Sequence, residues 1–372
     1  MSSENPAIVV RLERAVPECV GGRARHRWPR LAVESRPLGP LAPGSLRVRM
    51  LLAGVCGTDV HILRADPRTG EIACSAPLDV GPEGRVLGHE GVGQVCEVGE
   101  GVRTFAAGDV VTLESMMTCQ ECVACRRGQF NQCTRGRLIG TELDGFFRAL
   151  VDVPARIAHD VSDLARTAEG LRAMACVEPA ACAHVALTRL AVRPGERVVV
   201  FGAGPIGLYT AMLCRAAFGA GVDVVEPIAL RREAVRPWAD RVWDVEEFFV
   251  AASGEPFDVV VEASGQLDNV DRLFSRLAAC ARVGLLARCG QALRIEAVDH
   301  LISNGISIVG SRGHLGGSFA DVLGLCRAGR LPLQRSVTGM VDGLDALRRE
   351  LLSPDPIEHR HAKMLARLGE PA

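Results

Sequence analysis

Apolar residues in the first part of the chain occur in short runs that glycine and proline interrupt. This pattern is typical of β-strands joined by turns, so we expect a compact β-barrel-like domain. The clearest expected strands are residues 45–55, 91–99 and 108–114.

The pattern changes at about residue 182, where strand-like apolar runs begin to alternate with helical stretches rich in alanine and leucine. Strand–helix alternation predicts a parallel, doubly wound sheet and an α/β fold class. The expected strands of this sheet include residues 197–204, 222–227, 257–265 and 282–290.

The last fifty residues end in AKMLARL and predict a helix and a closing strand that return to the first domain. A chain of 372 residues is long enough for two domains that each bury a core. We expect one domain to comprise residues 1–181 together with 323–372, and the other to comprise residues 182–322.

Charge and composition narrow the class of protein. Lys and Arg total 43 against 44 Asp and Glu, and no basic stripe stands out, so nucleic acid is not an expected partner. The amino terminus does not read as a signal peptide, and no apolar run reaches the roughly 18 residues that span a bilayer. We therefore expect a cytoplasmic protein with no membrane partner.

The fourteen cysteines are many for such a chain, and clustered cysteines in a reducing compartment indicate metal binding or catalysis rather than disulfides. Four of them have the spacing C-x2-C-x2-C-x7-C: Cys119, Cys122, Cys125 and Cys133. Four thiolates on a short loop can close a tetrahedron around Zn²⁺ and leave no open position. The spacing therefore predicts a structural zinc site.

The stretch GAGPIG fits the pattern G-x-G-x-x-G, follows the apolar run VVVF and opens a helix. The glycines allow a tight turn and close approach of a pyrophosphate, and the helix amino terminus offers free N–H groups to it. We expect cofactor contacts from Gly202, Gly204, Pro205, Ile206 and Gly207.

Glu226 lies nineteen positions after Gly207, at the end of the next expected strand. A carboxylate there accepts hydrogen bonds from both ribose hydroxyls and repels a 2′-phosphate, which favours NAD over NADP. Arg231 and Arg232 leave NADP open as the alternative, because either could bind a phosphate, and we count Arg231 among the expected cofactor contacts.

A catalytic zinc needs few protein ligands and an open position for water or substrate. The candidate ligands are Cys56 in GVCGTDVH, His89 and Glu90 in GHEGVG, and Glu178 in CVEPAAC. No local spacing unites these residues, and a single cysteine or histidine is more often a packed side chain than a ligand. Spacing alone therefore does not nominate this set.

Together and in order, several segments resemble the zinc-containing medium-chain dehydrogenase/reductase superfamily. They run from about residue 45 to the carboxyl terminus and include GVCGTDVH, GHEGVGQVCEVGEGV, the four-cysteine loop, a Glu-Pro pair, VVVFGAGPIG and DVVVEASG. The resemblance implies a GroES-like catalytic domain built from both chain ends and a Rossmann domain inserted between them. It also implies two zinc ions per chain, one catalytic and one structural.

Carried onto this chain, the resemblance makes Cys56 and His89 ligands of the catalytic zinc, and Glu90 a ligand or an immediate neighbour of one. Glu178 occupies the position of a third ligand, and the Glu-Pro here is similar to sorbitol-, threonine- and glucose-dehydrogenase-like members. Cys176 is the alternative to Glu178, with packing as a small hydrophobe as its expected role.

Thr58 matches the family's Ser/Thr that holds the substrate hydroxyl, and His61 matches the position from which a proton relay reaches solvent. A histidine suits this relay because its unperturbed pKa of about 6.5 lies near working pH. Asp59 is expected to orient His89 by accepting its other ring N–H.

The resemblance implies hydride transfer between NAD and a small-molecule alcohol, and we expect a secondary alcohol of a polyol, sugar or (amino)cyclitol. A simple aliphatic alcohol or L-threonine is the alternative, followed by a zinc-free quinone-reductase-like enzyme and a non-catalytic NAD-binding protein. The 32 residues between Cys56 and His89 are expected to form a loop that sets specificity. Family members are commonly homodimers or homotetramers, and residues 306–317 are expected at such an interface.

Overall fold

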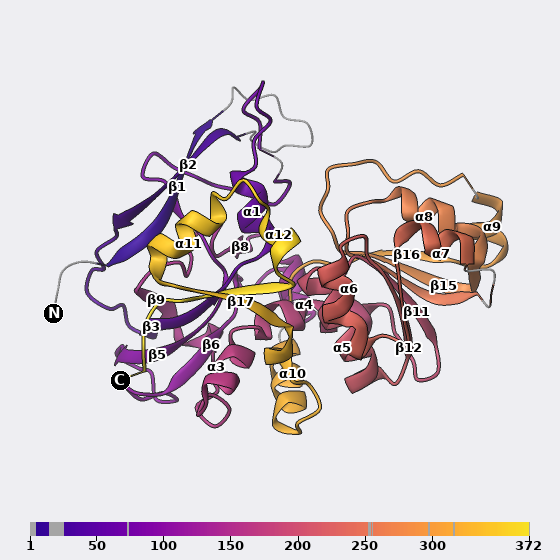
Figure 1. Ribbon diagram of the computed structural model, residues 1–372. Coiled ribbons are helices and arrows are strands. Elements are labelled where there is room, and N and C mark those ends of the chain that lie inside the picture. The colour runs from indigo at the N-terminus through magenta and orange to yellow at the C-terminus, as the bar shows by residue number, and fades with distance from the viewer. Residues whose placement is uncertain are drawn as a thin grey trace. The chain divides into compact units, whose positions relative to one another are not determined.

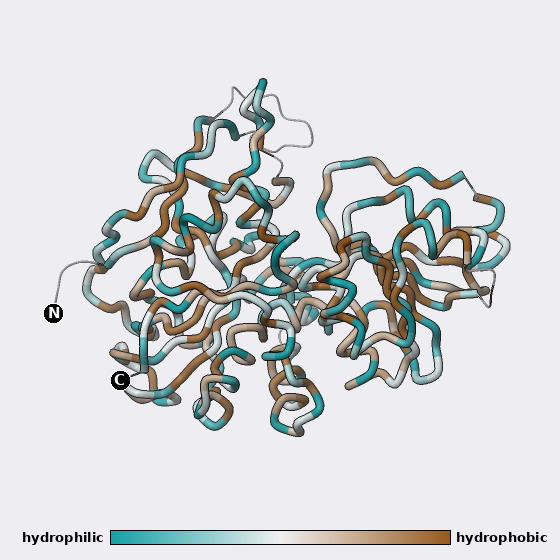
Figure 2. The backbone as a smooth tube through the Cα atoms, in the orientation of Figure 1, coloured by the Kyte–Doolittle hydropathy of each residue, from teal (hydrophilic) through white to brown (hydrophobic). Residues whose placement is uncertain are grey.

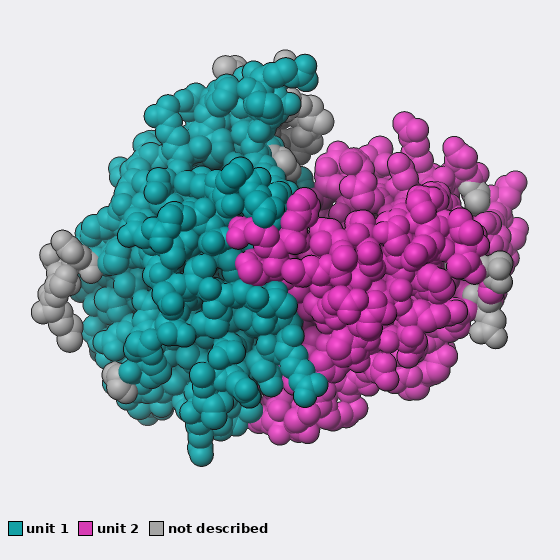
Figure 3. Space-filling model, viewed as in Figure 1, with its two compact units in different colours: residues 1–178, 333–357, 363–372 teal, residues 179–332, 358–362 magenta. Residues whose placement is uncertain are grey.

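The computed structural model describes residues 5–14, 26–72, 74–251, 254, 256–296, 298–314 and 317–371 (Figure 1). The chain divides into two compact units, which Figure 3 colours separately. Unit 1 contains residues 1–178, 333–357 and 363–372, and unit 2 contains residues 179–332 and 358–362. No helix in the described ranges is long and apolar enough to cross a membrane.

Unit 1 is built on a mainly antiparallel sheet with the strand order β10-β6-β5-β3-β18-β17, in which β9 also pairs with β3. The strands are β3 (Ser45–Gly54), β5 (Glu90–Val98), β6 (Val110–Leu113), β9 (Leu150–Pro154), β10 (Ala158–Asp160), β17 (Val337–Asp342) and β18 (Lys363–Arg367). The first half of β3 alternates between partly exposed and buried residues, and its second half is buried throughout. Leu46, Val48 and Met50 project from it into a core cluster that also contains Phe146.

Smaller elements complete unit 1. A second sheet has the order β2-β1-β4, and two short strands, β7 and β8, pair beside the four-cysteine loop. These strands are β1 (Pro6–Arg14), β2 (His26–Ser35), β4 (Arg85–Val86), β7 (Met116–Met117) and β8 (Arg137–Leu138). The helices are α1 (Gly57–Leu63), α2 (Val123–Arg126), α3 (Ala168–Met174) and α11 (Gly343–Leu351).

Unit 2 contains a parallel sheet with the strand order β13-β12-β11-β14-β15-β16. Its strands are β11 (Arg197–Phe201), β12 (Gly221–Val225), β13 (Arg241–Trp243), β14 (Phe257–Glu262), β15 (Leu277–Leu285) and β16 (Ser307–Gly310). The central strands are valine-rich and buried, as parallel strands covered on both faces are, and they are largely brown in Figure 2.

The order of these strands is 3-2-1-4-5-6 when they are numbered along the chain, which is the Rossmann order. The helices between them are α5 (Pro205–Leu213), α6 (Ala229–Val235), α7 (Val245–Ala251), α8 (Asp268–Leu273) and α9 (Val298–Ser303). Other helices are α4 (Val177–Arg189), which begins at the junction of the two units, α10 (Ser318–Arg327) and α12 (Ile357–Arg360). The expected α/β class, with a β-rich domain and a doubly wound parallel sheet, is thus confirmed.

Some strand limits differ from those expected. The strand expected at 197–204 ends at Phe201, because Gly202 takes the left-handed conformation, with φ +92°. The strand expected at 282–290 instead begins at Leu277 and ends at Leu285. Its first residues form an extension whose pairing with β14 shifts register between Phe257 and Val259.

Part of the long segment between Cys56 and His89 forms an ordered turn. The side chain of Asp66 accepts backbone N–H bonds from Arg68 at 2.8 Å and from Thr69 at 2.9 Å. An aspartate that caps its own turn in this way fixes the loop locally.

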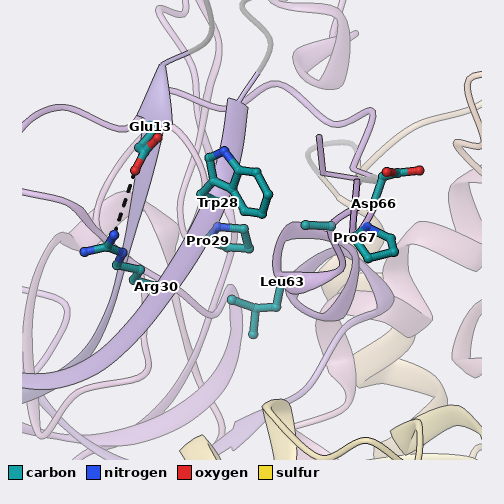
Figure 4. A pocket seen from close by; sticks show the side chains of 8 residues that line it. Glu13, Trp28, Pro29, Arg30, Leu63, Asp66 and Pro67 are labelled. Carbon is teal, nitrogen blue, oxygen red and sulfur yellow. Dashed lines mark ion pairs between the residues drawn. The ribbon is translucent and has the colours of Figure 1, made fainter. Parts of the chain in front are cut away.

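Trp28 anchors this turn to β2. Its backbone N–H donates to the carbonyl oxygen of Gly70 at 3.0 Å, and its indole lies so close that a Cβ at Gly70 would collide with the ring. The indole borders a hollow of about 560 Å³ (Figure 4). The hollow is lined by Glu13, Trp28, Pro29, Arg30, Leu63, Ala65, Asp66 and Pro67.

Phe248 offers a direct test of the core of unit 2. Its side chain is fully buried and meets the ring of Phe201 edge-on, with centroids 5.7 Å apart. We expect Phe248→Ala to lower the free energy of unfolding by about 3–5 kcal/mol, because it leaves a cavity and removes aromatic contacts. Urea unfolding followed by the fluorescence of the neighbouring Trp243 measures this change.

The matched control is Val250→Ala in the same helix, where the valine is 82% exposed. Its effect should stay within about 0.5 kcal/mol, as is usual for surface substitutions. Equal effects of the two substitutions would contradict this description of the core.

Candidate active site

The four clustered cysteines come together on one loop of unit 1. Their sulfur atoms lie within 4.8 Å of one another, and Cys133 Sγ is 3.4 Å from Cys119 Sγ and 3.9 Å from Cys122 Sγ. Cys119 Sγ is 4.0 Å from Cys125 Sγ. A tetrahedron with Zn–S bonds of about 2.3 Å has S···S edges of about 3.8 Å. The cluster therefore has the size of a four-thiolate zinc site.

The backbone of this loop favours thiolates. The N–H of Cys119 points to Cys133 Sγ, and the N–H of Cys122 points to Cys119 Sγ, both at 3.4 Å. Backbone N–H groups, that of Cys125 above all, lower the pKa of the Cys122 thiol to about 5. Burial raises the pKa of Cys125 to about 12. A metal bound by all four thiolates must therefore displace a proton from Cys125, so binding weakens in acid.

A second group joins two separate segments of unit 1. Cys56 lies immediately before α1, and His89 and Glu90 stand at the start of β5. Gly54, at the end of β3, pairs with Glu90 in the sheet, and this register brings the following Cys56 to the same place. The ligand atoms of Cys56, His89 and Glu90 lie within 4.8 Å of one another.

Asp59 fixes the backbone around this group. Its fully buried carboxylate accepts N–H bonds from Cys56 at 3.0 Å and from Gly88 at 3.2 Å, and Oδ1 lies 3.9 Å from His89 Nδ1. Burial disfavours the charged ring of His89, but Cys56, Asp59 and Glu178 outweigh burial and raise the pKa of His89 well above its usual value. The surroundings of His89 are thus strongly negative.

Lys363 supplies a positive charge beside the carboxylate of Glu90. No feature of the sequence suggested Lys363 as a residue of this site. It is 1% exposed, and its Nζ donates to Val55 O at 3.0 Å and forms an ion pair with Glu90 Oε2. Gly54 leaves room for this pair, because a Cβ there would collide with the Glu90 carboxylate. Burial raises the pKa of Glu90, and the Lys363 ammonium opposes that rise. No local pattern could reveal a partner 273 residues away.

Two buried polar atoms of this group, Glu90 Oε1 and His89 Nδ1, have no hydrogen-bond partner among the described residues. Buried polar atoms are rarely left unsatisfied, because each costs about 1–3 kcal/mol. Because Nδ1 faces Asp59, the nitrogen that His89 offers a metal is its other ring nitrogen. With Cys56 Sγ and Glu90 Oε1 it gives the sulfur, nitrogen and oxygen donors that zinc accepts. The residues fit a zinc ion that keeps an open position.

Glu178, the second residue of α4, falls outside the 4.8 Å group that the described residues form. Its Oε1 accepts a hydrogen bond from the hydroxyl of Ser115 at 2.7 Å. Its charge still reaches the group, since it raises the pKa of both His89 and Glu90. Cys176 is fully buried. Ser115 is a partner of Glu178 that no sequence pattern identified.

The two expected catalytic residues lie on α1, directly after Cys56. Thr58 and His61 are both half-buried. Asp59 and Val60 between them are buried, so the helix has a fixed face towards the protein interior. Thr58 and His61 are therefore held by a packed helix rather than by a free loop.

The glycine-rich turn of unit 2 joins β11 to α5. A Cβ on Gly207 would collide with the carbonyl oxygen of Gly202, so the helix packs directly on the turn. Gly204 caps α5 in an extended conformation, and Pro205 takes the first helical position. Gly204, Pro205 and Ile206 are partly exposed. The turn has the cradle of a dinucleotide pyrophosphate site.

Glu226 directly follows β12 and is 2% exposed. Its Oε2 accepts the N–H of Ala203 in the glycine-rich turn at 2.6 Å, and its Oε1 accepts the N–H of Ile228 at 2.9 Å. Arg231 Nη1 lies 3.7 Å from where a Cβ on Gly204 would stand. A fixed carboxylate and a cation thus flank the turn, and the residues fit a dinucleotide.

Comparison with known proteins agrees with this geometry. The alcohol dehydrogenase GroES-like domain family matches residues 42–163. The chain is 31% identical over 332 residues to scyllo-inosose 3-dehydrogenase of Thermotoga maritima, with 82% of each protein covered. It is 29% identical to L-threonine 3-dehydrogenase of Pyrococcus horikoshii, covering 82% of this chain and 86% of that protein. It is 27% identical to sorbitol dehydrogenase of Halalkalibacterium halodurans, covering 85% of this chain and 90% of that protein.

Among solved structures, a cobalt- and zinc-bound thermostable alcohol dehydrogenase from Pyrobaculum aerophilum superimposes with a TM-score of 0.74 at 25% identity. The match covers 91% of this chain and 95% of the other. The chain belongs to the zinc-containing medium-chain dehydrogenase/reductase superfamily. It is an oxidoreductase that acts on the CH–OH group of an alcohol or polyol.

The four-cysteine loop yields a test by metal analysis. We expect Cys122→Ser to remove one zinc ion per chain, because three thiolates and a hydroxyl do not complete the tetrahedron. Zinc per chain, measured by plasma mass spectrometry after dialysis, should fall from two to one. Cys280→Ser is the control, since Cys280 is exposed and lies outside both metal-ligand groups. Unchanged zinc in Cys122→Ser would contradict the site.

Proposed function

We propose that the protein is a zinc-dependent dehydrogenase that transfers a hydride between NAD and a secondary alcohol of a polyol, sugar or cyclitol. The observation that carries the proposal is the group of half-buried Cys56 with buried His89 and Glu90. Among the described residues, Oε1 of Glu90 has no hydrogen-bond partner, which supports the binding of a cation at this group.

The residues around this group have separable roles. When bound, zinc polarises the substrate oxygen as a Lewis acid, and the nicotinamide exchanges a hydride with the carbinol carbon. Asp59 holds the backbone of Cys56 and faces the ring of His89, so it keeps both donors in place. Lys363 balances the negative charge that Glu90 brings into the interior.

We assign Glu90 rather than Glu178 or Cys176 as the third protein ligand. Glu90 stands in the 4.8 Å group and Glu178 does not. Lys363 engages Glu90 Oε2 and leaves Oε1 for a metal, whereas the Ser115 hydroxyl engages Oε1 of Glu178. Glu178 then contributes a negative charge close to His89 and Glu90. Cys176, fully buried, keeps the role of a packed apolar side chain.

Proton transfer is assigned to α1. Thr58 holds the substrate hydroxyl, and His61 passes its proton to solvent, since both side chains are half-buried on a helix that begins beside Cys56. The second zinc belongs to Cys119, Cys122, Cys125 and Cys133, where it has a structural role.

NAD rather than NADP is proposed as the cofactor. Gly202, Gly204 and Gly207 form the cradle of the pyrophosphate, with Pro205 and Ile206 at its open side. The carboxylate of Glu226 is fixed by two backbone N–H groups beside this cradle, where it would meet the ribose. A 2′-phosphate there would face a like charge. Arg231, next to Gly204, would contact the phosphates that both cofactors share.

The substrate class rests on the relatives. Scyllo-inosose 3-dehydrogenase and a sorbitol dehydrogenase both align over more than four-fifths of this chain. The specific observation that favours a second candidate, L-threonine, is the alignment with L-threonine 3-dehydrogenase at 29% identity. A polyol and L-threonine both present a secondary alcohol, so the reaction is the same for either.

The assembly, compartment and domain limits are part of the proposal. β16 pairs with β15 and ends the described sheet of unit 2, so its open edge supports a homodimer or homotetramer. The gathering of four cysteines into a group that fits a metal supports a cytoplasmic location, because reducing compartments favour metal-binding cysteines over disulfides. We retain residues 1–181 with 323–372 as the catalytic domain and 182–322 as the nucleotide-binding domain. The first limit lies near the end of unit 1 at residue 178, whereas unit 2 extends to residue 332 and also holds residues 358–362.

A substrate panel tests the proposal. We expect the zinc-loaded protein to reduce NAD with polyols, aldoses, inositols or aminocyclitols, and to be at least about tenfold slower with NADP because of Glu226. L-Threonine, butanediol and primary alcohols complete the panel, and absorbance at 340 nm gives the rate. Turnover of L-threonine alone would replace the polyol assignment, and equal use of NADP would contradict the role of Glu226.

The catalytic group is tested by Cys56→Ser. Its kcat/KM should fall at least about a hundredfold, because the Lewis acid supplies several kcal/mol of transition-state stabilisation. Circular dichroism should remain that of the parent protein. The control Cys280→Ser should keep full activity, because Cys280 is exposed and outside the site. Full activity of Cys56→Ser would show that another site carries the reaction.

A further inference from the structure

Two adjacent arginines follow Glu226, and they occupy different surroundings. Arg231 lies beside Gly204 of the glycine-rich turn. Arg232, also on α6, turns back to the end of β12, where its Nη1 donates to the carbonyl oxygens of Glu226 at 2.8 Å and Pro227 at 2.6 Å. Arg232 therefore stands next to the acidic residue that faces the expected ribose.

Asp244 holds Arg232 in this position. It directly follows β13, the strand that pairs with β12, and its Oδ2 accepts a hydrogen bond from Arg232 Nη1 at 3.2 Å. The N–H of Glu226 donates to Trp243 O at 3.0 Å, which joins the ends of the two strands. Glu226, Arg232 and Asp244 thus meet at the carboxyl-terminal ends of β12 and β13.

We propose that Asp244 is a cofactor-specificity residue that restrains the Arg232 guanidinium and so withholds it from a 2′-phosphate. This inference rests on the proposed NAD site and extends it. An arginine is the side chain best suited to bind a phosphate, through paired N–H donors. Beside Glu226, a free Arg232 would offset the repulsion that excludes NADP. When Arg232 is paired with Asp244 and two carbonyl oxygens, it does not offset this repulsion.

The pair is only partly screened from water, since 24% of the Arg232 side chain and 39% of the Asp244 side chain are exposed. An ion pair at such a place is weak enough to be exchanged for a stronger partner. Removing Asp244 should therefore free Arg232 without disrupting the fold. Asp244→Asn is the suitable change, because asparagine also caps helices and can accept the Glu246 N–H bond that Asp244 now accepts.

The experiment is a double-mutant cycle on a Glu226→Ser background, which removes the dominant repulsion of NADP. Four proteins are compared: the background, the background with Asp244→Asn, with Arg232→Ala, and with both. Dissociation constants for NADPH and NADH are measured by the fluorescence of the bound reduced cofactor, so the readout does not depend on turnover. A cycle separates a charge effect of Asp244 from an effect that acts through Arg232.

We expect Asp244→Asn to tighten NADPH binding about tenfold when Arg232 is present, as one charge-assisted bond to phosphate would. In the Arg232→Ala background the same change should have less than about a twofold effect, because solvent and salt screen the charge itself. Relative to the Glu226→Ser background, adding Asp244→Asn, Arg232→Ala or both should change NADH binding less than about threefold, since NADH lacks the 2′-phosphate.

Asp240→Asn is the matched control. Asp240 also lies in unit 2, and its replacement by asparagine removes the same charge. Asp240, however, pairs with Arg215 at 3.6 Å and accepts the N–H of Val222 at 2.8 Å. The inference is overturned if Asp240→Asn tightens NADPH binding as much as Asp244→Asn does. It is also overturned if Asp244→Asn acts equally without Arg232. Failure of the parent protein to bind NADH would overturn the proposed function instead.

Discussion

Glu90 brings a carboxylate into the interior of unit 1, and Lys363 from the last strand meets it there. A lone buried charge costs several kcal/mol, so each residue requires the other. The ion pair joins the carboxyl-terminal strand β18 to β5. β18 also pairs with β3, with Leu365 opposite Gly54. Lys363 Nζ donates to Val55 O just before Cys56. Distant parts of the chain therefore build the group of Cys56, His89 and Glu90, and the ion pair between Glu90 and Lys363 stabilises their arrangement.

The same principle, a charge placed by backbone geometry, recurs in both units. Backbone N–H groups favour thiolates in the four-cysteine loop, and they fix the Glu226 carboxylate beside the glycine-rich turn. At each place the chain prepares an electrostatic environment before a ligand is bound. A cation suits the two groups of unit 1, and a ribose with free hydroxyls suits the edge of the sheet in unit 2.

Features encoded by neighbouring residues were predictable from the sequence. The four-cysteine spacing, the glycine-rich turn and the alternation of valine-rich strands with helices belong to this kind, although β11 ends at Phe201 because the glycine conformation begins the turn early. The partners that complete the sites were not predictable. Lys363 is 273 residues from Glu90 and Ser115 is 63 residues from Glu178, so tertiary pairing alone brings them together.

The central claim, a zinc ion held by Cys56, His89 and Glu90, is tested most directly by a crystal structure with anomalous data at the zinc absorption edge. The account predicts a peak about 2.3 Å from Cys56 Sγ and about 2.0–2.2 Å from a ring nitrogen of His89 and an oxygen of Glu90. A peak bound by Cys176 or Glu178 in place of Glu90, or no zinc at this group in an active protein, would contradict it.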